Sequence, residues 1–181
     1  MQKLIIYGFS DKDKNIILDI AKNFNIELLC CNEDDLNIKI SEIMKRQQQT
    51  KDTSKSDTKL LFFSDFNRAI IREFLITLKG KGILTNHKAI MTPTNRSWSL
   101  KYLLEHIKDE HETLKEYNKL GYHLKKLQNH YDNLKNSEDK QELKQIIDYT
   151  LSIKKIYDIT LEDVRIRQNK IDEYIKKHHP L

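Results

Sequence analysis

Polar side chains that could bind a ligand stand where predicted strands end in turns. They are Ser10, Asp65, Asn67, Thr92, Thr94 and Asn95. The carboxyl ends of parallel strands share one edge of a sheet, where the N-termini of the following helices present unpaired amides. These residues are therefore candidates for a pocket that binds a small anionic or polar ligand. The same residue types cap helices and form turns, and that alternative interpretation needs no ligand.

No residues have the spacing of a catalytic or metal site. Gly8 stands alone, and neither G-x-G-x-x-G nor G-x-x-x-x-G-K-[ST] occurs. His106 and Glu110 lie one helical turn apart beside His111, which could direct two ligands toward a metal, but no third ligand is supplied nearby. The sequence therefore predicts no catalytic residue, no metal and no cofactor, and it favours a protein that is not an enzyme.

The elements that must position the polar residues alternate between strand and helix. Four short apolar runs are typical of buried strands, at 4–7, 26–31, 60–63 and 87–91. Apolar residues at helical spacing separate the first run from the second and the third from the fourth, and a shorter helix is expected over 36–44. This alternation predicts an α/β fold with a small parallel sheet of about four strands, most simply in the order 2-1-3-4.

An internal repeat relates the two strand-helix-strand segments. A shift of 57 positions pairs Leu4 with Leu61 and Ile26 with Ile83, without a gap between them. The sequence thus predicts two duplicated βαβ units in one sheet. Cys30 and Cys31 fall in the second strand and lack the C-x-x-C spacing of metal or redox sites, so we expect two buried thiols.

The predicted organisation is an α/β domain over 1–100 and a helical part over 101–181. Residues 45–59 hold no aliphatic or aromatic side chain, which predicts a mobile polar loop inside the first domain. The period becomes helical after Trp98, which we expect to pack against the end of the sheet. The second part is predicted to be an antiparallel helical arm, which consists of a hairpin and a third helix. Thr160 and Asp163 are typical of the start of this third helix.

The long helix of this arm carries a regular apolar seam. Its residues alternate four and three apart, the spacing of a packed coiled coil. They are Leu120, Leu124, Leu127, Tyr131 and Leu134. We expect the seam to pack partly within the chain and partly against a second copy or another protein.

Charge and hydropathy limit the other classes of function. The chain has a formal net charge of +5, and its basic residues are spread along its length. Nucleic acid is therefore not the favoured partner, although the Lys-rich loop allows a weak association with RNA or DNA. No apolar run reaches the roughly 20 residues of a membrane helix, and no secretory signal is evident, so we expect a cytoplasmic protein.

The most distinctive stretch runs from Thr92-Pro93-Thr94-Asn95 through Trp98 and Leu103-Leu104 to Glu110-His111. It resembles a bacterial family of small proteins known only as a domain of unknown function, and the resemblance covers roughly residues 2–112. What the resemblance implies is a small α/β domain, without an established activity. The loop at 45–59 and the arm after about residue 118 depart from the family pattern.

Three hypotheses of function remain open. The first is a non-enzymatic interaction or regulatory protein that uses its helical arm for self-association or for binding a partner protein. The second is a sensor or enzyme that binds a small polar or anionic ligand at the carboxyl edge of the sheet. The third is weak binding of RNA or DNA through the Lys-rich loop.

Overall fold

The computed structural model describes residues 2–47 and 56–178. The chain divides into two compact units, an α/β unit over residues 1–107 and a helical unit over 108–181. Most of the predicted mobile loop at 45–59 lies outside the described residues. No helix in the described part is long and apolar enough to cross a membrane.

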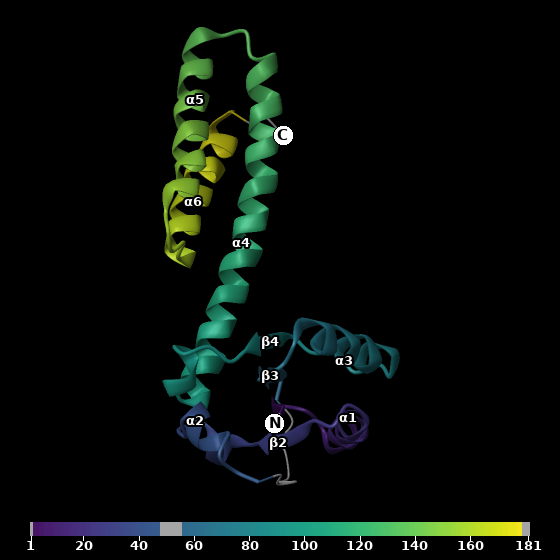
Figure 1. The fold of residues 1–181 in the computed structure, drawn as a ribbon. Helices are drawn as coiled ribbons and strands as arrows, with labels where there is room; N and C mark the ends of the chain where they lie inside the picture. Colours follow the sequence, from purple (N-terminus) through teal and green to yellow (C-terminus); the bar gives the residue numbers. More distant parts are fainter. Residues whose placement is uncertain (1, 48–55, 179–181) are drawn as a thin grey trace. The chain divides into compact units, whose positions relative to one another are not determined.

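The α/β unit is built on one four-stranded sheet (Figure 1). Its strands are β1 (Lys3–Tyr7), β2 (Glu27–Cys31), β3 (Leu60–Ser64) and β4 (His87–Ile90). Their order in the sheet is β2-β1-β3-β4, which confirms the predicted order and number of strands. The α/β fold class is therefore confirmed.

The sheet is not parallel throughout, because its two central strands run in opposite directions. The β1/β2 and β3/β4 pairs are parallel, but β1 pairs antiparallel with β3, with Lys3 opposite Ser64 and Tyr7 opposite Leu60. The prediction of a fully parallel sheet is wrong for the pairing of β1 with β3. A crossover helix enforces parallel pairing within each strand-helix-strand segment, whereas the segment between β2 and β3 is under no such constraint. The carboxyl ends of β1 and β2 consequently lie at one edge, and those of β3 and β4 at the opposite edge.

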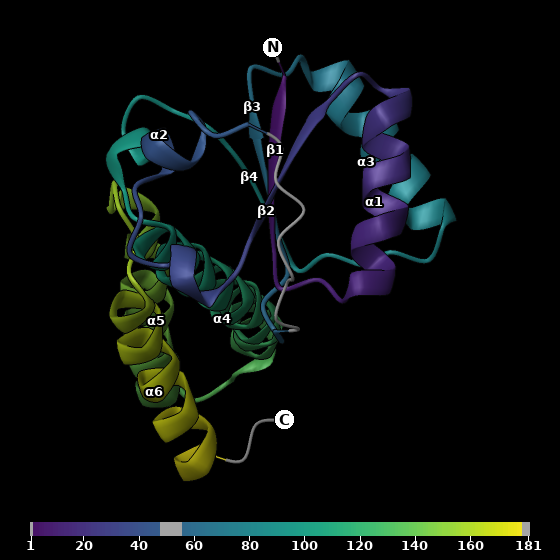
Figure 2. The same cartoon turned by 90° about the horizontal axis from the view of Figure 1, so that it is seen from below.

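Helices cover both faces of the sheet. Helices α1 (Asp11–Asn23) and α3 (Arg68–Gly80) lie on one face, as Figure 2 shows, over a core to which alternate strand residues such as Ile6 and Phe63 contribute. The intervening strand residues, such as Ile5 and Phe62, point to the other face. They pack against α2 (Ile40–Ile43) and the first turns of α4 (Leu100–Asn133). The central strands β1 and β3 are buried on both faces and have continuous apolar runs, whereas the edge strand β4 is partly exposed.

Backbone geometry repeats at the predicted interval of 57 residues. Left-handed φ angles occur at Gly8 and Asp65 after the first strand of each segment, and at Asn25 and Gly82 after its helix. Helices α1 and α3 are both 13 residues long, and their N-caps, Ser10 and Asn67, stand at the same interval. The turns, caps and helices therefore support the duplication that the sequence indicates.

From the second strand of each segment onward, the interval between equivalent residues is 60 instead of 57. Lys3 lies opposite Glu27 in the first strand pair and Leu60 opposite His87 in the second, so the second segment is three residues longer. Beyond this insertion, Lys39 and Ser99 stand 60 apart and form an antiparallel bridge to each other. We therefore describe residues 3–44 as the first copy and 60–104 as the second copy, joined about an approximate two-fold axis. Helix α2 is the short counterpart of the start of α4.

The helical unit is a bundle with its own core. It contains the rest of α4, α5 (Ser137–Leu151), the short helix η3 (Ser152–Lys155) and α6 (Leu161–His178). Figure 1 shows α5 returning alongside α4, as expected for a hairpin followed by a third helix. Side-chain contacts tie α6 to both helices: Arg165 Nη2 lies 2.8 Å from Glu112 Oε1 on α4, and Lys177 Nζ lies 2.8 Å from Glu142 Oε2 on α5.

Candidate functional site

The six predicted ligand residues do not come together, because the central strands are antiparallel. Ser10 follows β1, whereas Asp65 follows β3, so the two residues lie at opposite edges of the sheet. The prediction that all six share one edge is therefore wrong for Ser10. The Ser10 hydroxyl accepts a hydrogen bond from the Asp13 amide at 3.2 Å and caps α1.

At the edge after β3, the polar side chains also bond to their own turn. The Asn67 side-chain oxygen accepts from the amides of Ala69 (2.6 Å) and Ile70 (3.3 Å), which caps α3. The Ser64 hydroxyl donates to Asp65 Oδ2 at 3.2 Å. The Asn67 contacts satisfy the amides that a ligand at the helix N-terminus would otherwise bind.

The turn after β4 closes through a reciprocal pair of hydrogen bonds. Asn95 Oδ1 accepts from the Thr92 amide at 2.8 Å, and Thr92 Oγ1 accepts from the Asn95 amide at 3.2 Å. Asn95 Nδ2 also donates to the Ile90 carbonyl at 3.0 Å, and the Asn95 residue is only 8% exposed. Thr94 precedes a short helix, η2 (Asn95–Ser97), and makes no side-chain cap. Asn95 thus holds the backbone of the turn.

The first copy contains the same turn 60 residues earlier. The Asn32 amide donates to the buried Asp35 carboxylate at 3.1 Å, as the Thr92 amide does to Asn95. Arg46 Nη1 lies 2.6 Å from Asp35 Oδ1, so the buried charge has a partner. The agreement between the copies supports a structural role for this turn.

The predicted seam is packed inside the helical unit. Leu120 and Leu127 are 2% and 0% exposed, and the other three seam residues, Leu124, Tyr131 and Leu134, are partly buried against the same core. The seam faces α5 and α6 because three amphipathic helices of one chain suffice to cover it. The expectation that part of the seam is left for a second molecule is therefore wrong for Leu120 and Leu127.

A different set of residues forms an aromatic cluster at the start of α4, in which Tyr102 is exposed and Trp98 and His106 are partly buried. The ring of Trp98 lies 4.8 Å from those of Tyr102 and His106, between centroids, and Tyr102 stacks with His106 at 6.1 Å. Trp98 packs partly against the sheet core, as predicted, while Tyr102 is 50% exposed. In the sequence, the three aromatic residues follow one another at intervals of four. The interpretation of His106 as a possible metal ligand did not predict its contact with the other two rings. Within residues 2–47 and 56–178, no three His, Cys, Asp or Glu side chains group as metal ligands.

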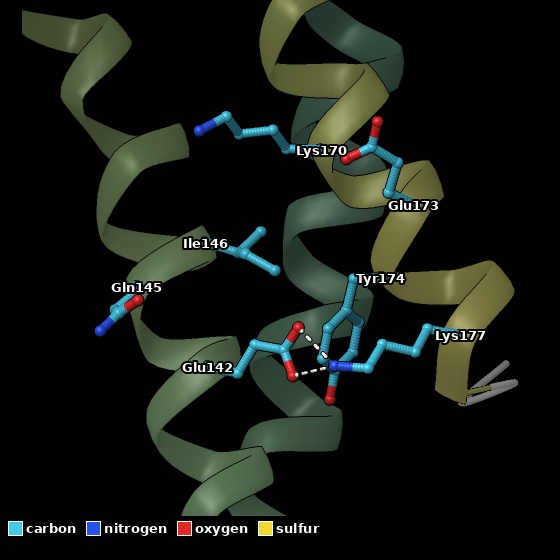
Figure 3. Close-up of a pocket in the computed structure, with 7 residues that line it drawn as sticks. All are labelled: Glu142, Gln145, Ile146, Lys170, Glu173, Tyr174 and Lys177. Atoms are coloured by element: carbon cyan, nitrogen blue, oxygen red, sulfur yellow. Dashed lines mark hydrogen bonds and ion pairs between the residues drawn. The ribbon is translucent and has the colours of Figure 1, made fainter.

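The helical unit contains a pocket of about 340 Å³ between α5 and α6 (Figure 3). Glu142 and Lys177 meet across it, and the Lys177 ammonium and neighbouring His178 hold the pKa of the Glu142 carboxyl below its ordinary value. The Tyr174 hydroxyl is buried without a hydrogen-bond partner among the described residues. Burial raises the pKa of this phenol, with a further contribution from Asp139 and Glu142.

The second copy matches a known domain family in sequence. Residues 59–114 match the family described as "Domain of unknown function (DUF3783)". The match spans β3, α3, β4, the turn at Thr92–Asn95 and the aromatic cluster, and it supports the expected resemblance to an uncharacterised domain family. No curated protein and no solved structure matches the chain.

Proposed function

We propose that the protein is a cytoplasmic, non-enzymatic interaction protein that self-associates through the aromatic cluster of Trp98, Tyr102 and His106. The observation that carries this proposal is the packing of Trp98 and His106, both partly buried, against Tyr102, which is 50% exposed. Tryptophan and tyrosine are enriched at protein interfaces because they offer a large apolar area at a small cost in conformational entropy. The cluster lies in the α/β unit at the start of the long helix, so this proposal keeps self-association through that helix but moves the contact away from the seam.

Comparison of the two copies supports a functional role for the cluster. In the first copy, Ile38 and Glu42 stand 60 residues before Trp98 and Tyr102. The fold therefore forms this position without an aromatic pair. Clustered aromatic side chains that the fold does not require are candidates for contact with a second molecule.

The spacing of the cluster suits contact with a second copy. Tyr102 lies four residues from Trp98, which stands just before α4, and four residues from His106, so antiparallel contact centred on Tyr102 would bring Trp98 toward His106 of a second copy. Lys101 and Glu105 flank Tyr102 and lie 4.0 Å apart within one chain. Because these opposite charges are already paired within one chain, they add no net charge beside Tyr102 to oppose the approach of a second copy.

Sedimentation velocity tests the proposal on the whole chain. We expect a monomer–dimer equilibrium that Tyr102→Ala weakens by about tenfold or more, the effect of losing one interfacial anchor. Tyr122→Ala is the matched control, since Tyr122 is an exposed tyrosine on the same helix, 59% accessible. A wild-type chain that stays monomeric at every concentration would contradict the proposal, as would equal effects of the two substitutions.

A further inference from the structure

A basic pocket of about 580 Å³ opens in the α/β unit where β1 and β2 begin. Four cationic side chains line it, with Glu27 as the one acidic lining residue. They are Lys3, Lys22, Lys45 and Arg46. Pockets of about 300–1,000 Å³ hold small molecules, so this one has the size for an anion larger than phosphate itself.

Two of the four cations are fixed by ion pairs. Lys3 Nζ lies 3.2 Å from Glu27 and donates to the Arg46 carbonyl at 2.9 Å. Arg46 is paired with the buried Asp35. These bonds hold Lys3 and Arg46 in place and neutralise the carboxylates of Glu27 and Asp35.

The other two cations stand at the rim without a strong partner. Lys22 is largely exposed and lies 3.6 Å from an exposed carboxylate, that of Asp19. Lys45 is exposed and has no ion pair with another described residue. Their charges give the pocket an excess of positive potential over a concave surface, which attracts and holds anions.

The fold does not require this basic set. Leu60 in the second copy takes the place of Lys3. Helix α2 ends at Ile43, so Lys45–Gln47 can turn back over the strand ends, whereas α4 runs on at the corresponding point. Lys3 has no basic counterpart in the second copy, and Lys45 and Arg46 follow directly after the first copy, so the complete basic set is not repeated, although Lys22 corresponds to Lys79.

We infer that this pocket binds a small anion that carries phosphate groups. Two exposed lysines beside an arginine held by an ion pair supply charge-assisted donors to phosphate oxygens. A nucleic acid would instead need an extended basic face, and the +5 net charge of this chain is spread along its length. Inorganic pyrophosphate is therefore the probe that fits the pocket.

Isothermal titration calorimetry with pyrophosphate at constant ionic strength tests the inference. We expect binding by the full chain that Lys22→Gln/Lys45→Gln weakens by about tenfold or more, since two charge-assisted contacts are lost. Lys79→Gln/Lys81→Gln is the matched control, because these exposed lysines lie in the second copy and Lys79 is the counterpart of Lys22. In amide NMR spectra, pyrophosphate should shift the signals of Asn25, Ile26 and Gln47.

Three results would overturn the inference. They are the lack of any pyrophosphate binding, equal losses in the two double variants, and binding of a single-stranded RNA oligomer without binding of pyrophosphate. The last result would favour nucleic acid as the partner. None of the four substituted lysines belongs to the aromatic cluster, so the outcome is independent of self-association.

Discussion

The residue that most constrains the local backbone is Gly8, in the turn after β1. Its φ is +80°, and a Cβ atom placed there would lie 2.0 Å from the Thr58 carbonyl oxygen. Asp65 is its counterpart in the second copy and also has a left-handed φ. The turn therefore needs both the conformational freedom of glycine and its lack of a side chain.

Substitution of Gly8 should destabilise the α/β unit. We expect Gly8→Ala to lower the free energy of unfolding by about 2–3 kcal/mol, because the methyl group collides with a backbone carbonyl at a strained φ. Gly121→Ala, in the middle of α4, meets nothing within 4 Å and should raise it by about 0.5–1 kcal/mol. Urea denaturation measures both changes, and equal effects would show that the turn is not tight.

At the residue scale, the sequence predicted capping better than it predicted binding. The residue types of Ser10 and Asn67 and the helices that follow them indicated candidate caps, and both residues are caps. The alternative role in ligand binding relied on a shared edge. That inference failed because the residues around a turn do not encode the direction of a distant strand.

At the scale of elements, the boundaries follow from local signals. Thr160 and Asp163 predicted the start of the third helix, and α6 begins at Leu161 with reciprocal hydrogen bonds between them. The antiparallel β1/β3 pairing was not predictable in the same way. An apolar run buried on both faces reads alike in both directions, so neither periodicity nor composition sets the orientation of β3.

The cap of α6 should make the stability of the helical unit depend on pH. Hydrogen bonds from Thr160 hold the pKa of the Asp163 carboxyl below its ordinary value. Its stabilising contribution is therefore complete above the ordinary aspartate pKa and is lost as the pH falls through the lowered one. We expect the melting temperature of wild type to exceed that of Asp163→Asn near neutral pH, by a margin that shrinks on acidification.

Thermal unfolding monitored by circular dichroism measures this margin at each pH. Glu162→Gln is the control, because Glu162 lies in the same first turn and shares its electrostatic environment without making the capping hydrogen bonds. A margin for Asp163→Asn that grows as the pH falls would contradict the sign of the pKa shift.

At the scale of the whole molecule, the chain consists of two units with separate cores. The seam spacing correctly indicated helix packing, but such spacing does not reveal whether the partner helix belongs to the same chain. Three helices within residues 108–178 cover Leu127 completely. The aromatic cluster was not predicted, because its members are of three residue types and their spacing of four residues is also that of a helix face packed in the core.

Because the two units have separate cores, a cavity created in one core should destabilise that unit alone. We expect Leu127→Ala to cost about 2–5 kcal/mol of stability in the helical unit, as for other fully buried leucines. Hydrogen exchange followed by mass spectrometry should then speed up in α5 and α6 and stay unchanged in β1 and β3. An equal acceleration in the sheet would show that the two units unfold as one.

Trp98 fluorescence tests self-association most directly, because Trp98 is the single tryptophan of the chain and belongs to the aromatic cluster. On about a thousandfold dilution, enough to cross a typical dimer equilibrium, we predict that its emission shifts to longer wavelength as the partner leaves. For Tyr102→Ala, this shift should occur at a concentration higher by about tenfold or more. Emission that stays constant on dilution of the wild-type chain would contradict the proposed interface.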